Sequence, residues 1–66
     1  MSIKQLVDYC LGMIQEFPAL QNEIKDLFQL ALDEIEQGES EPNEIELCYM
    51  AIEGEVDEYL KFKNNE

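Results

Sequence analysis

Carboxylates are the most abundant side chains in this sequence that could take part in catalysis, metal binding or charge recognition. The stretch from Asp26 to Glu58 holds twelve of them and no Lys, Arg or His. Carboxylates transfer protons when two of them differ in burial, bind hard cations when several converge, and attract basic surfaces when they line one face. Their spacing, and the elements that carry them, decide between these uses.

Catalysis has little support in the residue types. The sequence has no histidine, no arginine and no glycine-rich phosphate loop, and Ser2 and Ser40 fall at an expected helix cap and an expected loop. Acid–base work by paired carboxylates needs unequal burial, whereas most of these acids fall on polar helix faces. We therefore predict a protein that is not an enzyme and uses no cofactor.

One segment suggests a cation site. The residues DEIEQGESEPNE resemble the loop of a calcium-binding helix–loop–helix, with Asp33 at its first position, Gly38 at its sixth and Glu44 at its twelfth. Ile35 and Gln37 depart from that pattern at the third and fifth positions, where oxygen ligands of Asp or Asn type are usual. The resemblance implies a calcium-responsive switch as one alternative. The other is that Gly38 ends a helix and the glutamates face water, and we assign no metal ligand.

The sharpest pattern among the carboxylates lies late in the sequence. Glu46, Glu53 and Asp57 fall on one side of an expected helix, where residues four apart are separated by about 6 Å, comparable with phosphates along a nucleic-acid strand. We predict that an acidic ridge binds a basic surface of a partner protein, such as a surface that normally holds nucleic acid. The ridge comprises Glu36, Glu39, Glu46, Glu53 and Asp57. The alternative is that the net charge of −12 serves solubility alone.

The same charge excludes other partners. Nucleic acid and anionic membranes would meet a surface of their own sign, so direct binding to either is not expected. Tyr9 lies off the apolar stripe of the first expected helix and is left free for an interface. In size and charge the chain is similar to small acidic helical proteins such as phage anti-defence proteins, nucleic-acid mimics and toxin-immunity proteins. That resemblance implies an inhibitor or regulator of phage or bacterial origin, although no motif ties the chain to one family.

Hydrophobic periodicity predicts the elements that position these side chains. Apolar residues recur at helical spacing in three segments, so we expect an all-α fold, a small antiparallel three-helix bundle in one domain. Ser2 and Gln5 form a capping box, Pro18 closes the first helix, and Gly38 ends the second. The expected helices cover residues 3–17, 19–37 and 44–62, the last capped by Asn43, and a frayed tail covers 63–66.

The third expected helix carries apolar residues on two sides. Its inward stripe consists of Ile45, Cys48, Tyr49, Ile52, Val56, Tyr59 and Leu60. On its back an association patch of Leu47, Met50, Ala51 and Gly54 repeats at i, i+3, i+4 and i+7. We predict that this patch contacts a second chain, that Leu32 extends it, and that Gly54 allows close helix approach. The alternative function is therefore a helical homodimer that serves as an assembly module.

Two further features bear on the compartment. Cys10 and Cys48 fall on core faces, where a buried thiol behaves as a small hydrophobe, so a disulfide framework is not expected. The N-terminus lacks a secretory pattern, and no apolar run approaches the roughly 20 residues that span a bilayer. We expect a cytoplasmic protein.

Overall fold

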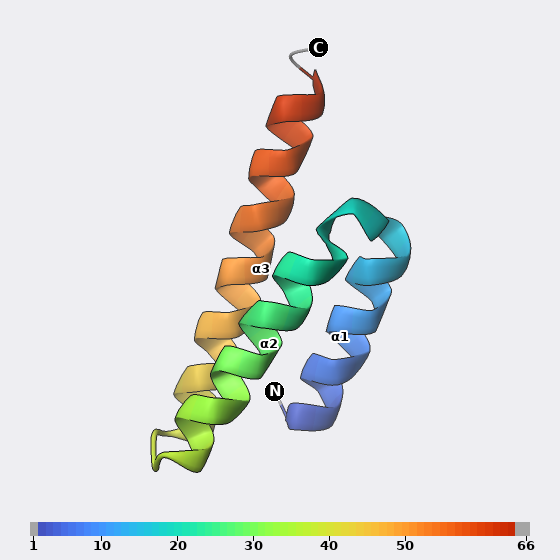
Figure 1. Ribbon diagram of the computed structural model, residues 1–66. Coiled ribbons are helices and arrows are strands. Elements are labelled where there is room, and N and C mark those ends of the chain that lie inside the picture. Colours follow the sequence, from blue (N-terminus) through green and yellow to red (C-terminus); the bar gives the residue numbers. More distant parts are fainter. Residues whose placement is uncertain (1, 65–66) are drawn as a thin grey trace.

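The computed structural model describes residues 2–64, which form three α-helices and one short 3₁₀ turn (Figure 1). The elements in order are α1 (Ile3–Glu16), η1 (Pro18–Leu20), α2 (Gln21–Glu36) and α3 (Glu41–Asn64). Successive helices run in opposite directions, so α2 is antiparallel to both of its neighbours. The all-α three-helix fold is confirmed for the described residues.

Local signals in the sequence fix the start and end of α1. The Ser2 hydroxyl accepts a hydrogen bond from the Gln5 backbone N–H (3.2 Å), and the Ser2 N–H donates to the Gln5 side-chain oxygen (2.8 Å), which confirms the predicted capping box. Phe17 leaves the helix because a following proline disfavours the α conformation, and Pro18 then opens η1. The first helix thus ends at Glu16, one residue earlier than predicted.

The turn between α2 and α3 follows the predicted glycine. Gly38 has a φ of 103°, in the left-handed region, and its N–H donates to the Ile35 carbonyl at 3.0 Å. The prediction that α3 begins near residue 44 is wrong, because the helix starts at Glu41 with Pro42 in its first turn. Proline is tolerated there, where its missing N–H would have no intrahelical partner. Asn43 consequently lies inside α3 and does not cap it.

The other end of α3 also differs from expectation. Lys63 and Asn64 are helical, so the predicted frayed tail is wrong for these two residues. Asn65 and Glu66 lie outside the described residues. The charges at both ends of α3 favour the helix. Glu41 and Glu44 lie at its positive N-terminal end, and two lysines lie at its negative C-terminal end.

A single small core holds the helices together, and it consists of Leu6, Cys10, Leu20, Ile24, Ala31, Ile45, Cys48 and Ile52. Among the described residues, no polar or charged residue is buried. Leu27 and Ile35 of α2 are only half-buried. Leu60, predicted on the inward stripe of α3, is exposed.

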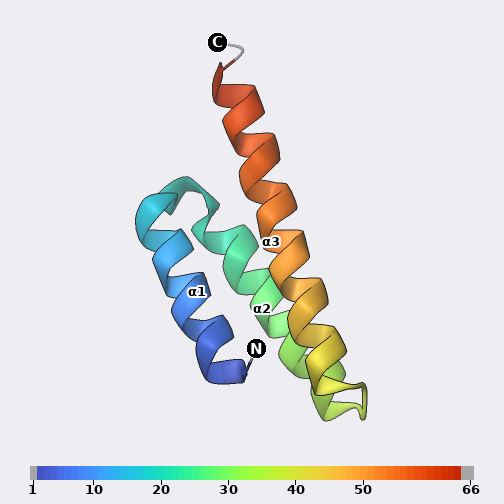
Figure 2. The same cartoon turned by 180° about the vertical axis from the view of Figure 1, so that it is seen from behind.

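The exposure of Leu60 follows from the length of α3. Figures 1 and 2 show the C-terminal part of α3 extending past the turn between α1 and α2, in a molecule of 43 × 18 × 17 Å. The last half-buried residue of α3 is Tyr59, whose ring meets Phe17 edge to face with centroids 6.1 Å apart. Beyond it, no other helix within residues 2–64 covers the apolar side of α3.

Aromatic stacking joins α1 to α3. The rings of Tyr9 and Tyr49 stack with centroids 4.4 Å apart, and both residues are half-buried. Burial raises the pKa of Tyr9, with Tyr49 and then Glu53 adding to the effect. The prediction that Tyr9 is free for an interface is therefore wrong, because its ring already has a partner within the chain.

Candidate functional site

The acidic ridge is exposed at every position. Glu46, Glu53 and Asp57 lie on α3, Glu36 ends α2, and Glu39 lies in the turn between the two helices. Glu39 and Glu46 line one shallow hollow, together with Glu44, Leu47 and Met50. Glu36, Glu53 and Asp57 are not among the residues that line this hollow, so the structure brings together only Glu39 and Glu46 of the five there.

The four lysines lie outside the stretch from Asp26 to Glu58 in the sequence, and Lys61 follows Asp57 by about one helical turn. Of the four lysines, Lys4 and Lys25 belong to α1 and α2, whereas Lys61 and Lys63 lie in the last turn of α3. The Nζ atom of Lys63 is 5.9 Å from the centre of the Tyr59 ring, so this ammonium group already makes a cation–π contact within the chain. The twelve carboxylates from Asp26 to Glu58 therefore have no cation among them in the sequence, which makes this part of the chain strongly negative.

The association patch lies on the outside of α3. Leu47 and Met50 are 57% and 58% exposed, Ala51 is half-buried, and Gly54 is exposed. A Cβ atom added to Gly54 would meet no atom within 4 Å. The expected close helix approach at Gly54 thus does not occur within this chain, and the residue weakens α3 without serving its packing.

A leucine of α2 continues the patch, and sequence reasoning chose the wrong one. Leu32, expected to extend the patch, is half-buried and is not among the residues that line the groove beside Leu47. Leu30 is 56% exposed and does line that groove. The sequence analysis did not identify Leu30, and the signal that could have found it is its helical spacing from Leu27, which also lines the groove.

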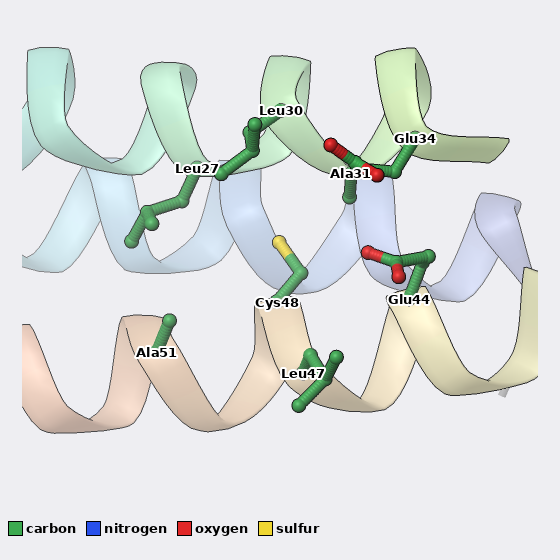
Figure 3. Close-up of a pocket in the computed structure, with 8 residues that line it drawn as sticks. All are labelled: Leu27, Leu30, Ala31, Glu34, Glu44, Leu47, Cys48 and Ala51. Atoms are coloured by element: carbon green, nitrogen blue, oxygen red, sulfur yellow. The ribbon is translucent and has the colours of Figure 1, made fainter. Parts of the chain in front are cut away.

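The groove between α2 and α3 has a volume of about 300 Å³. Eight residues line it (Figure 3): Leu27, Leu30, Ala31, Glu34, Glu44, Leu47, Cys48 and Ala51. Ala31, Cys48 and Ala51 are small, and they lie between the two helices where larger side chains would fill the space. Glu34 and Glu44 are half-buried, and their carboxylates lie at the same end of the groove.

The two cysteines belong to the core and not to a reactive site. Both are free thiols and both are buried, as the sequence predicted. Burial raises the pKa of Cys10, and burial together with the nearby Cys10 raises the pKa of Cys48 to about 11. Because only the thiolate is nucleophilic, neither thiol is suited to covalent catalysis at neutral pH.

The segment that resembles a calcium loop does not form one. Asp33 lies in the last turns of α2, Glu44 lies in the first turn of α3, and only residues 37–40 separate the two helices. Within residues 2–64, no group of three or more His, Cys, Asp or Glu side chains could hold a metal ion. The twelve residues that resemble a calcium loop thus form two helix ends and a turn.

Comparison with protein-family models, curated proteins and solved structures finds no match to this chain. Over residues 2–64, the helices are too short or too polar to cross a membrane. The surface combines exposed carboxylates along α3 with an apolar groove between α2 and α3.

Proposed function

We propose that this chain is a non-enzymatic binding protein, an inhibitor or regulator that occupies a basic surface of a partner protein. The carrying observation is the exposed line of carboxylates on α3, formed by Glu46, Glu53 and Asp57, with no cation in the sequence between Lys25 and Lys61. A basic partner surface supplies the charges that this chain lacks.

The energetics support a binding role for these acids. Like charges four residues apart on a helix destabilise it by a few tenths of a kcal/mol per pair, so the Glu53 and Asp57 pair weakens the free protein slightly. Lysines or arginines of a partner relieve that repulsion and speed association by electrostatic steering. The spacing of about 6 Å between such residues matches a phosphate backbone, so a surface that normally holds nucleic acid is a suitable target.

The test reverses the charge of two ridge residues. Affinity capture at low salt, followed by identification of the bound protein, supplies the partner, and Glu53→Lys with Asp57→Lys supplies the variant. We expect the association rate to fall about 10-fold or more at low ionic strength and the difference to shrink as salt is added. Circular dichroism should show an intact helical fold, because both side chains are exposed.

A matched control separates the ridge from the total charge. Asp8→Lys with Glu16→Lys makes the same change in net charge on exposed positions of α1. The ridge variant should lose far more of the association rate than this control. Equal losses would mean that only total charge steers the encounter, and unchanged rates for both variants would leave the carboxylates as a solubility device. Competition between this chain and nucleic acid for the captured partner would identify a nucleic-acid mimic.

A second candidate function is a homodimeric assembly module. The exposure of Leu47 and Met50 on α3 favours it, because a small monomer gains no folding energy from apolar residues that face water. Each chain carries a net charge of −12, however, so a dimer forms against strong repulsion that salt would relieve. Sedimentation at low and high salt tests this candidate: a dimer that Met50→Lys dissociates without loss of helix supports it, and a monomer under all conditions removes it.

A further inference from the structure

An apolar groove remains open between α2 and α3. Its floor is formed by Ala31 and Cys48, both buried, and its sides by leucines of the two helices. In Figure 3 α1 lies behind the α2 and α3 pair, so the groove opens on the side away from α1. It exists because small residues occupy the positions where α2 and α3 approach each other.

Large apolar side chains surround this groove without filling it. Leu30 borders it from α2, Leu47 borders it from α3, and Met50 lines the adjoining hollow on α3. Each of the three is more than half exposed. They contribute little to the core, and a second molecule that covered them would gain the apolar contact that the bundle leaves unused.

The charge around the groove selects the kind of molecule that covers it. Glu34 and Glu44 lie at one end of the groove (Figure 3). Glu39 and Glu46 line the hollow next to it. No lysine is among the residues that line either space. A second copy of this chain would bring a further charge of −12 and be repelled by the carboxylates that border the groove. A cationic occupant would form ion pairs with those carboxylates.

The shape of the groove points to a helix. Two antiparallel helices leave a channel into which the ridge of side chains of a third helix packs, and an amphipathic helix presents its apolar residues at i, i+3, i+4 and i+7 to such a channel. An occupant there would lie across α2 and α3 from α1, and the four helices together would resemble a four-helix bundle.

We infer that the groove between α2 and α3 binds an amphipathic, basic helix of the partner protein. The apolar side chains of the bound helix contact Leu30, Leu47 and Met50, and the Lys or Arg side chains of that helix pair with Glu34 and Glu44. The inference rests on the proposed function, since it names the element by which the basic partner binds.

Synthetic peptides test the inference directly. The probe is a fluorescein-labelled peptide of about 18 residues, five helical turns, with Leu at i, i+3, i+4 and i+7 positions and Lys elsewhere. A control peptide of the same composition scatters the leucines around the helix, and another replaces every Lys by Glu. Fluorescence anisotropy should show that the wild-type chain binds the probe about 10-fold or more tighter than either control peptide.

Protein variants locate the bound peptide. Leu30→Ala with Leu47→Ala should weaken binding of the probe about 10-fold, and Glu34→Gln with Glu44→Gln should weaken it mainly at low salt. Leu11→Ala is the matched control, because Leu11 is 55% exposed and borders a different groove, between α1 and α2. That control should bind the probe as the wild type does, and circular dichroism checks that every variant remains helical.

The outcomes separate the groove from the acidic ridge. If the scattered peptide binds as tightly as the probe, and Glu53→Lys with Asp57→Lys weakens both, the groove inference fails while the proposed function stands. Equal binding of the Glu-containing peptide would overturn the charge selection, and an equal loss with Leu11→Ala would move the peptide to the other groove. Failure of the probe to bind at any salt concentration, with the captured partner still bound, would also overturn the inference.

Discussion

The inward and outward sides of α3 both carry apolar residues, but only the inward side is buried. On the inward side, Ile45, Cys48 and Ile52 are at most 5% exposed, whereas on the outward side Leu47 and Met50 are more than half exposed. Both sets repeat at helical spacing. Periodicity therefore identifies apolar faces, and the number of neighbouring helices decides which of them is covered.

This difference follows from how few elements the chain has. α1 and α2 pack against one side of α3, and α2 makes the more extensive contact of the two. Nothing else within residues 2–64 is left to cover the outward side. An apolar face that folding does not use, beside a line of carboxylates that folding does not need, is the basis of the binding role proposed above.

The largest expected effect separates the two sides by stability. Ile52 is fully buried, so Ile52→Ala should lower the free energy of unfolding by about 2–5 kcal/mol, enough to unfold so small a bundle. Met50→Ala, two residues away on the outward side, should change it by less than about 0.5 kcal/mol. Urea denaturation followed by circular dichroism measures both, and Ile52→Val, expected to cost about 0.5–1.5 kcal/mol, gives a measurable intermediate.

Similar losses for Ile52→Ala and Met50→Ala would contradict this comparison. They would mean that Met50 is covered in solution, by a second copy or by another packing of the bundle. Repeating the Met50→Ala measurement over a range of protein concentrations distinguishes these explanations, because only association makes the stability depend on concentration.

Most of the fold could be predicted from the sequence because its signals are local. The capping box of Ser2 with Gln5, and the left-handed Gly38, depend on residues within four positions of each other, and both predictions are confirmed. The start of α3 was missed because Pro42 suits a loop and a first helical turn equally well, and only the turn geometry decides between them.

The candidate site was less predictable because it depends on two helices at once. A helical wheel placed Leu47 and Met50 on the outward side of the third helix. It could not show which residues of α2 lie opposite which residues of α3. Leu30 was consequently not identified as part of the patch, and the free interface expected for Tyr9 did not take account of the stack that Tyr49 provides across the bundle. The groove itself results from small side chains facing one another, a property of the pair that neither helix shows alone.

A smaller effect tests Cys48, which lies where the core meets the groove. Its pKa is raised from 9.0 to about 11 in the folded chain, so the unfolded chain ionises first as the pH rises. The stability that the neutral thiol contributes is thus fully present below pH 9 and is lost between pH 9 and about 11. We expect that loss to be about 1 kcal/mol, because Cys48 borders the open groove and water screens part of the charge.

Cys48→Ala isolates this contribution. The variant is expected to be less stable at neutral pH, since it loses a buried sulfur atom, but its stability should fall less steeply than that of the wild type in the alkaline range. Denaturation at a series of pH values measures both slopes. The difference between the two curves reports Cys48 together with its coupling to Cys10 and Tyr9. Parallel curves would show that Cys48 is as accessible to water in the folded chain as in the unfolded one.

The smallest expected effect concerns the glycine of the outward side. A Cβ added at Gly54 or at Gly12 in α1 would meet no atom within 4 Å, so Gly54→Ala and Gly12→Ala should each stabilise the free chain by about 0.5–1 kcal/mol. Equal gains in denaturation experiments would show that neither glycine serves the bundle. Binding then separates them: if the captured partner packs closely against α3 at Gly54, Gly54→Ala weakens its binding while Gly12→Ala does not. Equal affinities for both variants would limit the interface to the ridge and the groove, and would exclude Gly54 from the association patch.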